Sequence, residues 1–274
     1  TPSQIFGYHE GLMLSDVPTF DAFHDLKGTD KNYIWRSGIK HDCSKVMELR
    51  RQGDAFLNGK GDVAELEDEF VYPLLKSSDL ANGRLDGARL NVIVTQSRVG
   101  EETDRIATVA PRTWRYLNEN SALLDKRGST IYKNKPRFSM FGIGPYAFAK
   151  WKVAISGFYK RLDFRIVGPI EGKPTMLDDT VYFLDCASEE EAEFLSELLN
   201  SSDAISFLSS MVFWSDKRPI TVDLLKRLHI GKLAKRLGRE RDYRDFVARR
   251  QSSPLFAQAK ENEAAARSTA SAPT

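Results

Sequence analysis

The chain has 274 residues, 41% of them hydrophobic, which is enough for one sizeable core or two small domains. No apolar run reaches the roughly 18 residues of a membrane span, no secretory signal is visible, and the two cysteines, Cys43 and Cys186, exclude a disulfide framework. The net charge of +2 by itself points to no class of partner. We therefore expect a cytoplasmic protein that does not bind membranes.

The first half of the chain mixes short strands and helices. Residues 1–30 show little periodicity, and we expect them to form a leading arm. Residues 53–62 read as a turn, and Pro73 limits any helix within residues 66–76. The regular elements predicted here are a strand at 33–35, a helix at 44–51, a strand at 90–95 and a helix at 111–127.

The pattern changes after residue 137, where apolar runs alternate with Gly, Pro and Asp. These runs predict four strands, at 138–144, 152–156, 164–167 and 180–184. Helices are predicted at 188–200, with Ser188 as the N-cap, and at 204–213, 221–236 and 239–250. The fold class expected is α+β, a mostly antiparallel sheet with flanking helices and a C-terminal helical region.

This order of elements suggests a division into domains. Residues 31–230 would form the main domain, and residues 231–251 a basic helical extension. Residues 252–274 are rich in Ala, Ser, Glu and Pro, a composition typical of a disordered tail. We see no internal repeat.

Positive charge is concentrated in the middle of the chain. Residues 126–173 carry 11 Lys and Arg against 2 Asp and Glu, whereas residues 174–212 carry no cation and 9 acids. A basic block of this kind is typical of a surface that faces a polyanion, although a solvated surface that happens to be locally basic explains the charge equally well.

Two stretches of this block combine cations with hydroxyl, amide and aromatic side chains, which suit phosphates and bases together. The charges of Lys126 and Arg127 have another explanation, because cations stabilise the C-terminus of a helix. Phe148 is more easily read as a core residue. The predicted DNA contacts are Ser129, Tyr132, Lys133, Asn134, Lys135, Arg137, Tyr146, Lys150 and Lys152.

The sequence lacks the common catalytic motifs, having no GxxxxGK[ST], HExxH or GxSxG. One weak alternative is a Mg²⁺-dependent nuclease centred on Asp163, Glu171 and Lys173, an acid followed by E-x-K. A third hypothesis is a protein-interaction module, in which Trp35 or the apolar helices within 188–213 dock a separate catalytic subunit.

Seven short strings, in order, resemble the region that follows the catalytic domain in adenine-N6 DNA methyltransferases of restriction–modification systems. The resemblance covers roughly residues 33–230 and is to the TaqI/Eco57I-like target-recognition (specificity) domain. The strings are Val71–Asp79 (VYPLLKSSD), Ala110–Leu117 (APRTWRYL), Phe141–Phe148 (FGIGPYAF), Lys152–Ser156 (KVAIS), Asp178–Leu184 (DDTVYFL), Leu198–Ser201 (LLNS) and Lys217–Thr221 (KRPIT).

The resemblance implies the recognition half of such an enzyme without its catalytic half. The F-x-G-x-G motif for S-adenosylmethionine is missing, since Met140 stands where the phenylalanine would precede Gly142 and Gly144, and the chain has no [DNS]-P-P-[YFW] motif. The expected partners are double-stranded DNA and a methyltransferase catalytic domain or subunit. No cofactor is expected in this chain, because S-adenosylmethionine would bind in that catalytic partner.

Overall fold

The structure is a computed structural model that describes residues 5–252, and in it the chain divides into two compact units. Unit 1 contains described residues 5–37, 151–167 and 180–252, and unit 2 contains residues 38–150 and 168–179. The chain therefore leaves unit 1 twice and returns to it twice. The basic block at 126–173 is split by this division, since residues 151–167 belong to unit 1 and the rest to unit 2.

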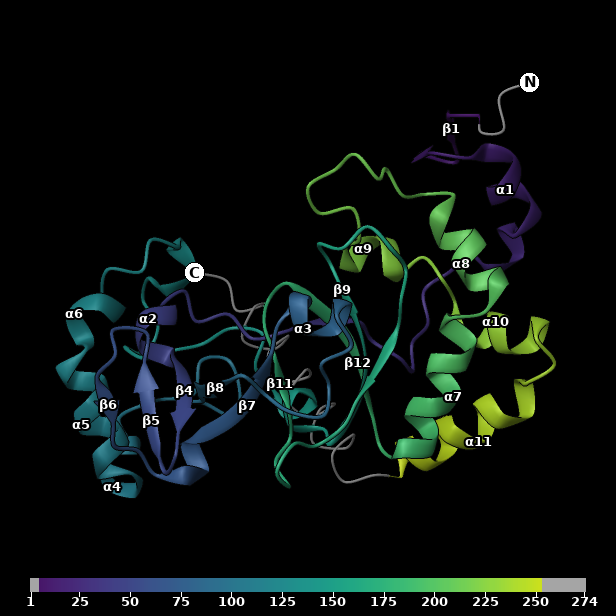
Figure 1. Ribbon diagram of the computed structural model, residues 1–274. Helices are drawn as coiled ribbons and strands as arrows, with labels where there is room; N and C mark the ends of the chain where they lie inside the picture. The colour runs from purple at the N-terminus through teal and green to yellow at the C-terminus, as the bar shows by residue number, and fades with distance from the viewer. Residues whose placement is uncertain (1–4, 253–274) are drawn as a thin grey trace, which may run out of the picture. The chain divides into compact units, whose positions relative to one another are not determined.

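Unit 1 is built on an antiparallel sheet in the order β10-β9-β12-β3, whose two central strands, β9 and β12, are labelled in Figure 1. The strands are β3 (Arg36–Ser37), β9 (Trp151–Ser156), β10 (Arg165–Val167) and β12 (Val181–Cys186). β9 lies between β10 and β12, and all its residues from Lys152 to Ser156 are buried. Lys152 is paired in register with Asp185 of β12.

Helices cover this sheet and complete the core of unit 1. Ser188 caps α7 by accepting a hydrogen bond from the Glu191 backbone N–H at 3.2 Å, and Thr221 caps α9 in the same way. Phe194, Leu195 and Leu198 of α7 are buried in the core. The helices are α7 (Glu189–Leu199), α8 (Ser202–Ser209), α9 (Val222–Leu225), α10 (Ile230–Arg236) and α11 (Glu240–Gln251).

The N-terminal segment packs into the same core. It forms the hairpin β1 (Gly7–His9) and β2 (Leu12–Leu14), then α1 (Val17–Ala22) and the 3-10 turn η1 (His24–Leu26). Phe20 is fully buried and stacks on Phe207 of α8 with ring centroids 5.7 Å apart. The described part of the predicted arm is therefore part of unit 1, and the predicted boundaries at residues 31 and 230 fall inside this unit.

Unit 2 is built on a second sheet in the order β11-β7-β8-β4-β5-β6, in which only the β11–β7 pairing is parallel (Figure 1). Pro73 lies within β7 opposite Asn91 of β8. The strands are β4 (Glu48–Gln52), β5 (Ala55–Asn58), β6 (Val63–Ala64), β7 (Val71–Leu75), β8 (Leu90–Ile93) and β11 (Met176–Leu177).

Short helices surround this second sheet. In Figure 1, α4, α5 and α6 lie along one side of strands β4–β6, and Tyr116, Leu117 and Leu124 bury their side chains in a common core with Leu49. The helices are α2 (Ser44–Met47), α3 (Ser77–Ala81), α4 (Ile106–Val109), α5 (Pro111–Glu119), α6 (Ser121–Leu124), and the 3-10 turns η2 (Asp68–Phe70), η3 (Thr130–Tyr132) and η4 (Pro145–Phe148).

The predicted α+β class is confirmed, but several elements differ from the prediction. Residues 48–51 continue as strand β4, and residues 55–58 of the predicted turn form β5. The helix predicted at 111–127 is interrupted at Asn120, and that at 221–236 is interrupted before His229, which caps α10.

Residues 138–144 do not form the predicted strand. Gly142 has a φ of +67°, and a Cβ at that position would lie 2.2 Å from the Gly38 carbonyl oxygen. The backbone of this string therefore turns to pack tightly against another part of unit 2, and only Phe141 pairs with a neighbour, Lys40, as an isolated bridge.

Within the part of the chain that the structure describes, no helix is long and apolar enough to cross a membrane. The predicted disordered tail, residues 252–274, lies almost wholly outside the described residues, which end at Ser252.

Truncating Phe20 tests whether the N-terminal segment belongs to the fold. We expect Phe20→Ala to lower the free energy of unfolding by about 3–5 kcal/mol, because it leaves a cavity in the core. Tyr8→Ala is the control, since Tyr8 is 75% exposed and its loss should change stability by less than about 0.5 kcal/mol. Urea unfolding followed by tryptophan fluorescence reports mainly on unit 1, which holds Trp35, Trp151 and Trp214, whereas Trp114 lies in unit 2. Equal midpoints for the two variants would contradict this packing.

Candidate nucleic-acid interface

Eight of the nine predicted DNA contacts lie in unit 2, and one lies in unit 1. Residues 129–137 follow α6 and contain the 3-10 turn η3, whereas Tyr146 lies in η4 and Lys150 follows it. Lys152 belongs to β9 of unit 1. The structure therefore keeps most of the predicted set on one unit but separates Lys152 from it.

Arg127 fixes the course of the segment that carries these residues. Its guanidinium donates to the carbonyl oxygens of Leu124 at 2.8 Å, Ser139 at 2.7 Å and Arg137 at 2.8 Å. The bond to Leu124 fits the helix-end role expected from the sequence. The other two close the segment 128–138 into a loop whose ends are held together by one side chain.

Two further residues shape this loop. The Tyr132 ring lies beneath the Arg127 guanidinium, 3.8 Å from its carbon to the ring centroid, and packs edge-on against Phe141 at 5.3 Å. Burial raises the pKa of the Tyr132 hydroxyl, which keeps it a neutral donor. Asn134 has a φ of +57°, a left-handed conformation that asparagine adopts more easily than most residues.

The cations of the loop differ in whether they form ion pairs with a carboxylate. Lys133 and Lys135 are exposed, and no ion pair joins either of them to another described residue. Arg137 pairs with Asp125 at 2.8 Å, and its hydrogen bond holds the pKa of that carboxyl below its ordinary value. Lys133 and Lys135 are thus the cations of this loop best placed to meet a phosphate, while Arg137 is already partly neutralised.

The second predicted stretch is more buried than the first. Phe148 packs edge-on against Tyr72 with centroids 5.6 Å apart, as the core interpretation expected. Tyr146 is partly buried against the same core, and its ring closes over Gly144, where a Cβ would lie 2.5 Å from Cε1. Lys150 is exposed. Of this stretch, Lys150 has the clearest access to a ligand.

Lys152 does not fit the role predicted for it. Its side chain is 1% exposed in the middle strand of the unit 1 sheet, so it has no access to a phosphate on the surface. Burial lowers the pKa of its ammonium to about 7, against the opposing effect of Asp185 on the neighbouring strand. The sequence pattern did not reveal the burial of Lys152. In a strand that is covered on both faces, no side chain faces solvent, so a polar residue there can be as buried as its apolar neighbours.

Unit 1 presents a basic and aromatic surface that the sequence analysis did not single out. In the loop between β9 and β10, Tyr159, Lys160 and Arg161 are exposed. The Arg218 guanidinium, from the segment between α8 and α9, lies 4.6 Å from the centroid of the Phe158 ring. The sequence does contain a signal for this surface, the string Phe-Tyr-Lys-Arg directly after Gly157, since aromatics beside cations are typical of nucleic-acid contacts.

The residues of the nuclease hypothesis are engaged elsewhere. Glu171 pairs with Arg51 at 2.8 Å, and Lys173 donates to the Asp68 and Val71 carbonyl oxygens. Asp163, in unit 1, pairs with Arg161 and Arg165. Among residues 5–252 there is no group of three or more His, Cys, Asp and Glu side chains placed to hold a metal ion. The geometry gives this hypothesis no support.

The apolar side chains that the interaction-module hypothesis requires on the surface are buried in the core of unit 1. Trp35 packs at 5.8 Å from Phe164, and the apolar faces of α7 and α8 are buried. These side chains are therefore not available as a docking surface in this fold.

The sequence is similar to a Type II methyltransferase. It is 47% identical over 229 residues to Type II methyltransferase M.NspV of Nostoc sp. (strain ATCC 29411 / PCC 7524). The match covers 84% of this chain and 48% of M.NspV, so the chain spans about half the length of this relative. No family model matches the chain.

Replacing Arg127 tests whether this side chain holds the loop 128–138 closed. We expect Arg127→Lys to speed tryptic cleavage after Lys133. The guanidinium reaches its three carbonyl groups through three separate nitrogen atoms, whereas a lysine carries all its donors on one nitrogen and cannot span both sides of the loop, which then loses its closure. Lys126→Ala is the control, since Lys126 is exposed, and it should leave the cleavage rate near that of the unmodified chain. Cleavage after Lys133 is quantified by mass spectrometry of timed digests. Equal rates in both variants would contradict the role of Arg127.

The buried Lys152 makes a pH-dependent contribution to stability. Its pKa is about 7 in the fold but about 10.4 in an unfolded chain. Between these values the unfolded chain binds a proton that the folded one does not, so this group makes stability rise with pH. We expect the stability advantage of Lys152→Met over the unmodified chain to shrink as the pH rises from about 7 to about 9. Urea midpoints at several pH values measure it, and a constant difference would contradict the burial.

Proposed function

We propose that this chain is the DNA target-recognition part of a site-specific adenine-N6 DNA methyltransferase of a restriction–modification system. The observation that carries the proposal is the 47% identity to a Type II methyltransferase in a match that covers only 48% of that relative. A segment of that extent leaves room for a separate catalytic half. The order of the seven strings that resemble a target-recognition domain supports the same assignment.

Gly142 and Gly144 do not fit the glycine motif that binds S-adenosylmethionine in such enzymes. Gly142 and Gly144 are the only remnant of the expected motif, and Met140, in place of the phenylalanine, is fully buried. Gly142 is in direct contact with the Gly38 carbonyl, and the Tyr146 ring covers Gly144. Both glycines therefore serve packing within unit 2. On this proposal the cofactor and the chemistry belong to the catalytic half.

The exposed cations of unit 2 supply the attraction for DNA. Lys133, Lys135 and Lys150 are on the surface, and lysines position phosphates without reading sequence. The neighbouring Ser129 and Asn134 carry donors and acceptors of the kind that read base edges in the major groove. Rigid closure of the loop by Arg127 would hold these groups in one register on the duplex.

The salt dependence of duplex binding tests this function. We expect the logarithm of the binding constant to fall linearly with the logarithm of salt concentration, with a slope of about −0.9 for each phosphate contact. Lys133→Ala with Lys135→Ala should make the slope shallower by about 1.8 and weaken binding equally on all sequences, because only phosphate contacts are lost. Fluorescence anisotropy with labelled duplexes gives both quantities.

The control removes two charges elsewhere. Arg98→Ala with Arg241→Ala removes two exposed cations that lie outside the loop, one from each unit, and should leave the slope unchanged. A slope near zero for the unmodified chain would refute DNA binding. A normal slope that the loop variant leaves unchanged would refute the role of Lys133 and Lys135.

A further inference from the structure

A groove lined by positive charge lies on unit 2, formed by residues outside the loop described above. It has a volume of about 580 Å³ and runs along α2, strands β4 and β5 and the turn after β5. Four cations line it, and Glu48 is the single carboxylate among its lining residues. The cations are Lys45, Arg50, Lys60 and Lys76.

The carboxylate in the groove is already neutralised. The Lys76 ammonium donates to both Glu48 oxygens, at 2.6 and 2.7 Å, and His41 Nε2 lies 3.4 Å from one of them. Burial alone would raise the pKa of the Glu48 carboxyl, but the bonds from His41 and Lys76 hold it below its ordinary value. Glu48 therefore stays ionised and occupied, and does not repel an anion as a bare carboxylate would.

The cations that remain are only partly paired. Lys60 makes an ion pair with Asp62 at 2.6 Å. Lys45 and Arg50 are exposed, and no ion pair connects either of them to a carboxylate of residues 5–252. These two side chains supply uncompensated positive charge to the groove, where the walls of the protein reduce screening by solvent.

The backbone holds the cations of the groove in place. Arg50 lies opposite Leu57 in the β4–β5 hairpin. The Gly59 N–H donates to the Lys45 carbonyl at 3.0 Å, and a Cβ on Gly59 would lie 2.8 Å from the Lys45 Cα. The turn that carries Lys60 is thus seated directly on α2, so Lys45 and Lys60 come from two segments in backbone contact.

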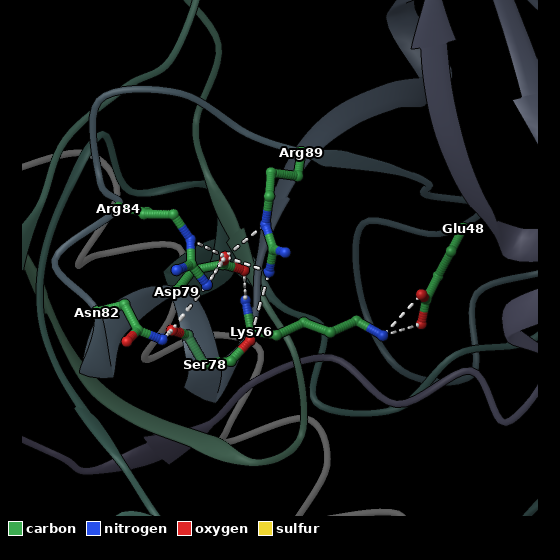
Figure 2. Close-up of polar contacts among 7 residues, drawn as sticks. All are labelled: Glu48, Lys76, Ser78, Asp79, Asn82, Arg84 and Arg89. Carbon is green, nitrogen blue, oxygen red and sulfur yellow. Dashed lines mark hydrogen bonds and ion pairs between the residues drawn. The ribbon is translucent and has the colours of Figure 1, made fainter.

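A pair of arginines continues the positive charge beside the groove (Figure 2). The Asp79 carboxylate, 3% exposed, accepts from Arg84 Nε at 3.2 Å and from Arg89 Nε and Nη2 at 3.0 and 2.6 Å. Both arginines remain well exposed, at 41% and 58%. One buried carboxylate therefore fixes two guanidinium groups and neutralises only one of them.

The arginine pair and the groove share one residue. The Lys76 backbone N–H donates to Asp79 Oδ2 at 3.0 Å, while its side chain extends to Glu48 in the groove (Figure 2). Across both features six cations stand against three carboxylates, Glu48, Asp62 and Asp79. Lys76 thus links the groove to the arginine pair.

We propose that this groove, with Arg84 and Arg89 at its border, binds the phosphodiester backbone of duplex DNA. The inference rests on the proposed function and adds to it a second phosphate-binding surface on unit 2. Duplex DNA presents one negative charge for roughly every 1.7 Å of its axis, which suits an extended row of cations better than a single anion would. Contacts of this kind set the position of a protein on DNA and carry no sequence information.

The test is the double variant Lys45→Ala, Arg50→Ala, because neither side chain holds a buried carboxylate and the fold is expected to stay intact. Changing Arg84 or Arg89 instead would leave Asp79 buried with less compensation. We expect the log–log salt slope for a duplex to become shallower by about 1.8, with an equal loss of affinity on every sequence. The control is Arg98→Ala, Arg241→Ala, which should behave as the unmodified chain, and thermal unfolding checks that all variants are folded.

The outcomes separate this inference from the proposed function. A groove variant that behaves like the control, while the Lys133 and Lys135 variant weakens binding, overturns the groove and leaves the function standing. A slope near zero for the unmodified chain overturns both.

Discussion

The half-buried guanidinium of Arg127 donates to carbonyl groups on both sides of the loop 128–138, and the predicted DNA-binding segment depends on this contact. A planar group with five donors can satisfy several carbonyl oxygens that would otherwise be without partners. Because the Arg127 guanidinium is hydrogen-bonded to backbone carbonyl groups, the exposed positive charge of the loop comes from Lys133 and Lys135. A similar division recurs at Asp79, where one buried carboxylate orients two arginines that still face solvent.

Local signals in the sequence predicted the elements that depend on neighbouring residues. The helix α7 was predicted correctly because Ser188, the acidic first turn and the apolar stripe all lie within one short window. Strand β8 was also predicted from a local signal, the apolar run at residues 90–95. The string at 138–144 was assigned wrongly as a strand, because its shape is decided by the contact of Gly142 with Gly38, about a hundred residues earlier in the chain.

Long-range organisation was beyond the sequence reasoning. The division into two units depends on the chain returning to unit 1 at β9 and again at β12. No pattern in the neighbouring sequence indicates either return. The burial of Lys152 follows from its place in a central strand, so a basic residue in a basic block turned out to be a core residue. The charge of Lys45, Arg50 and Lys60 was missed because these residues lie outside that block and gather only when α2 and the β4–β5 hairpin pack.

The central claim is that unit 2 carries the surface that meets DNA, and lysine footprinting tests it most directly. The chain is treated with an acetylating reagent with and without duplex DNA, and modification of each lysine is measured by mass spectrometry. The account predicts that DNA protects Lys133 and Lys135 of the loop and Lys45 and Lys60 of the groove, while the exposed Lys31 of unit 1 stays as reactive as before. Equal reactivity of the unit 2 lysines with and without DNA would contradict it.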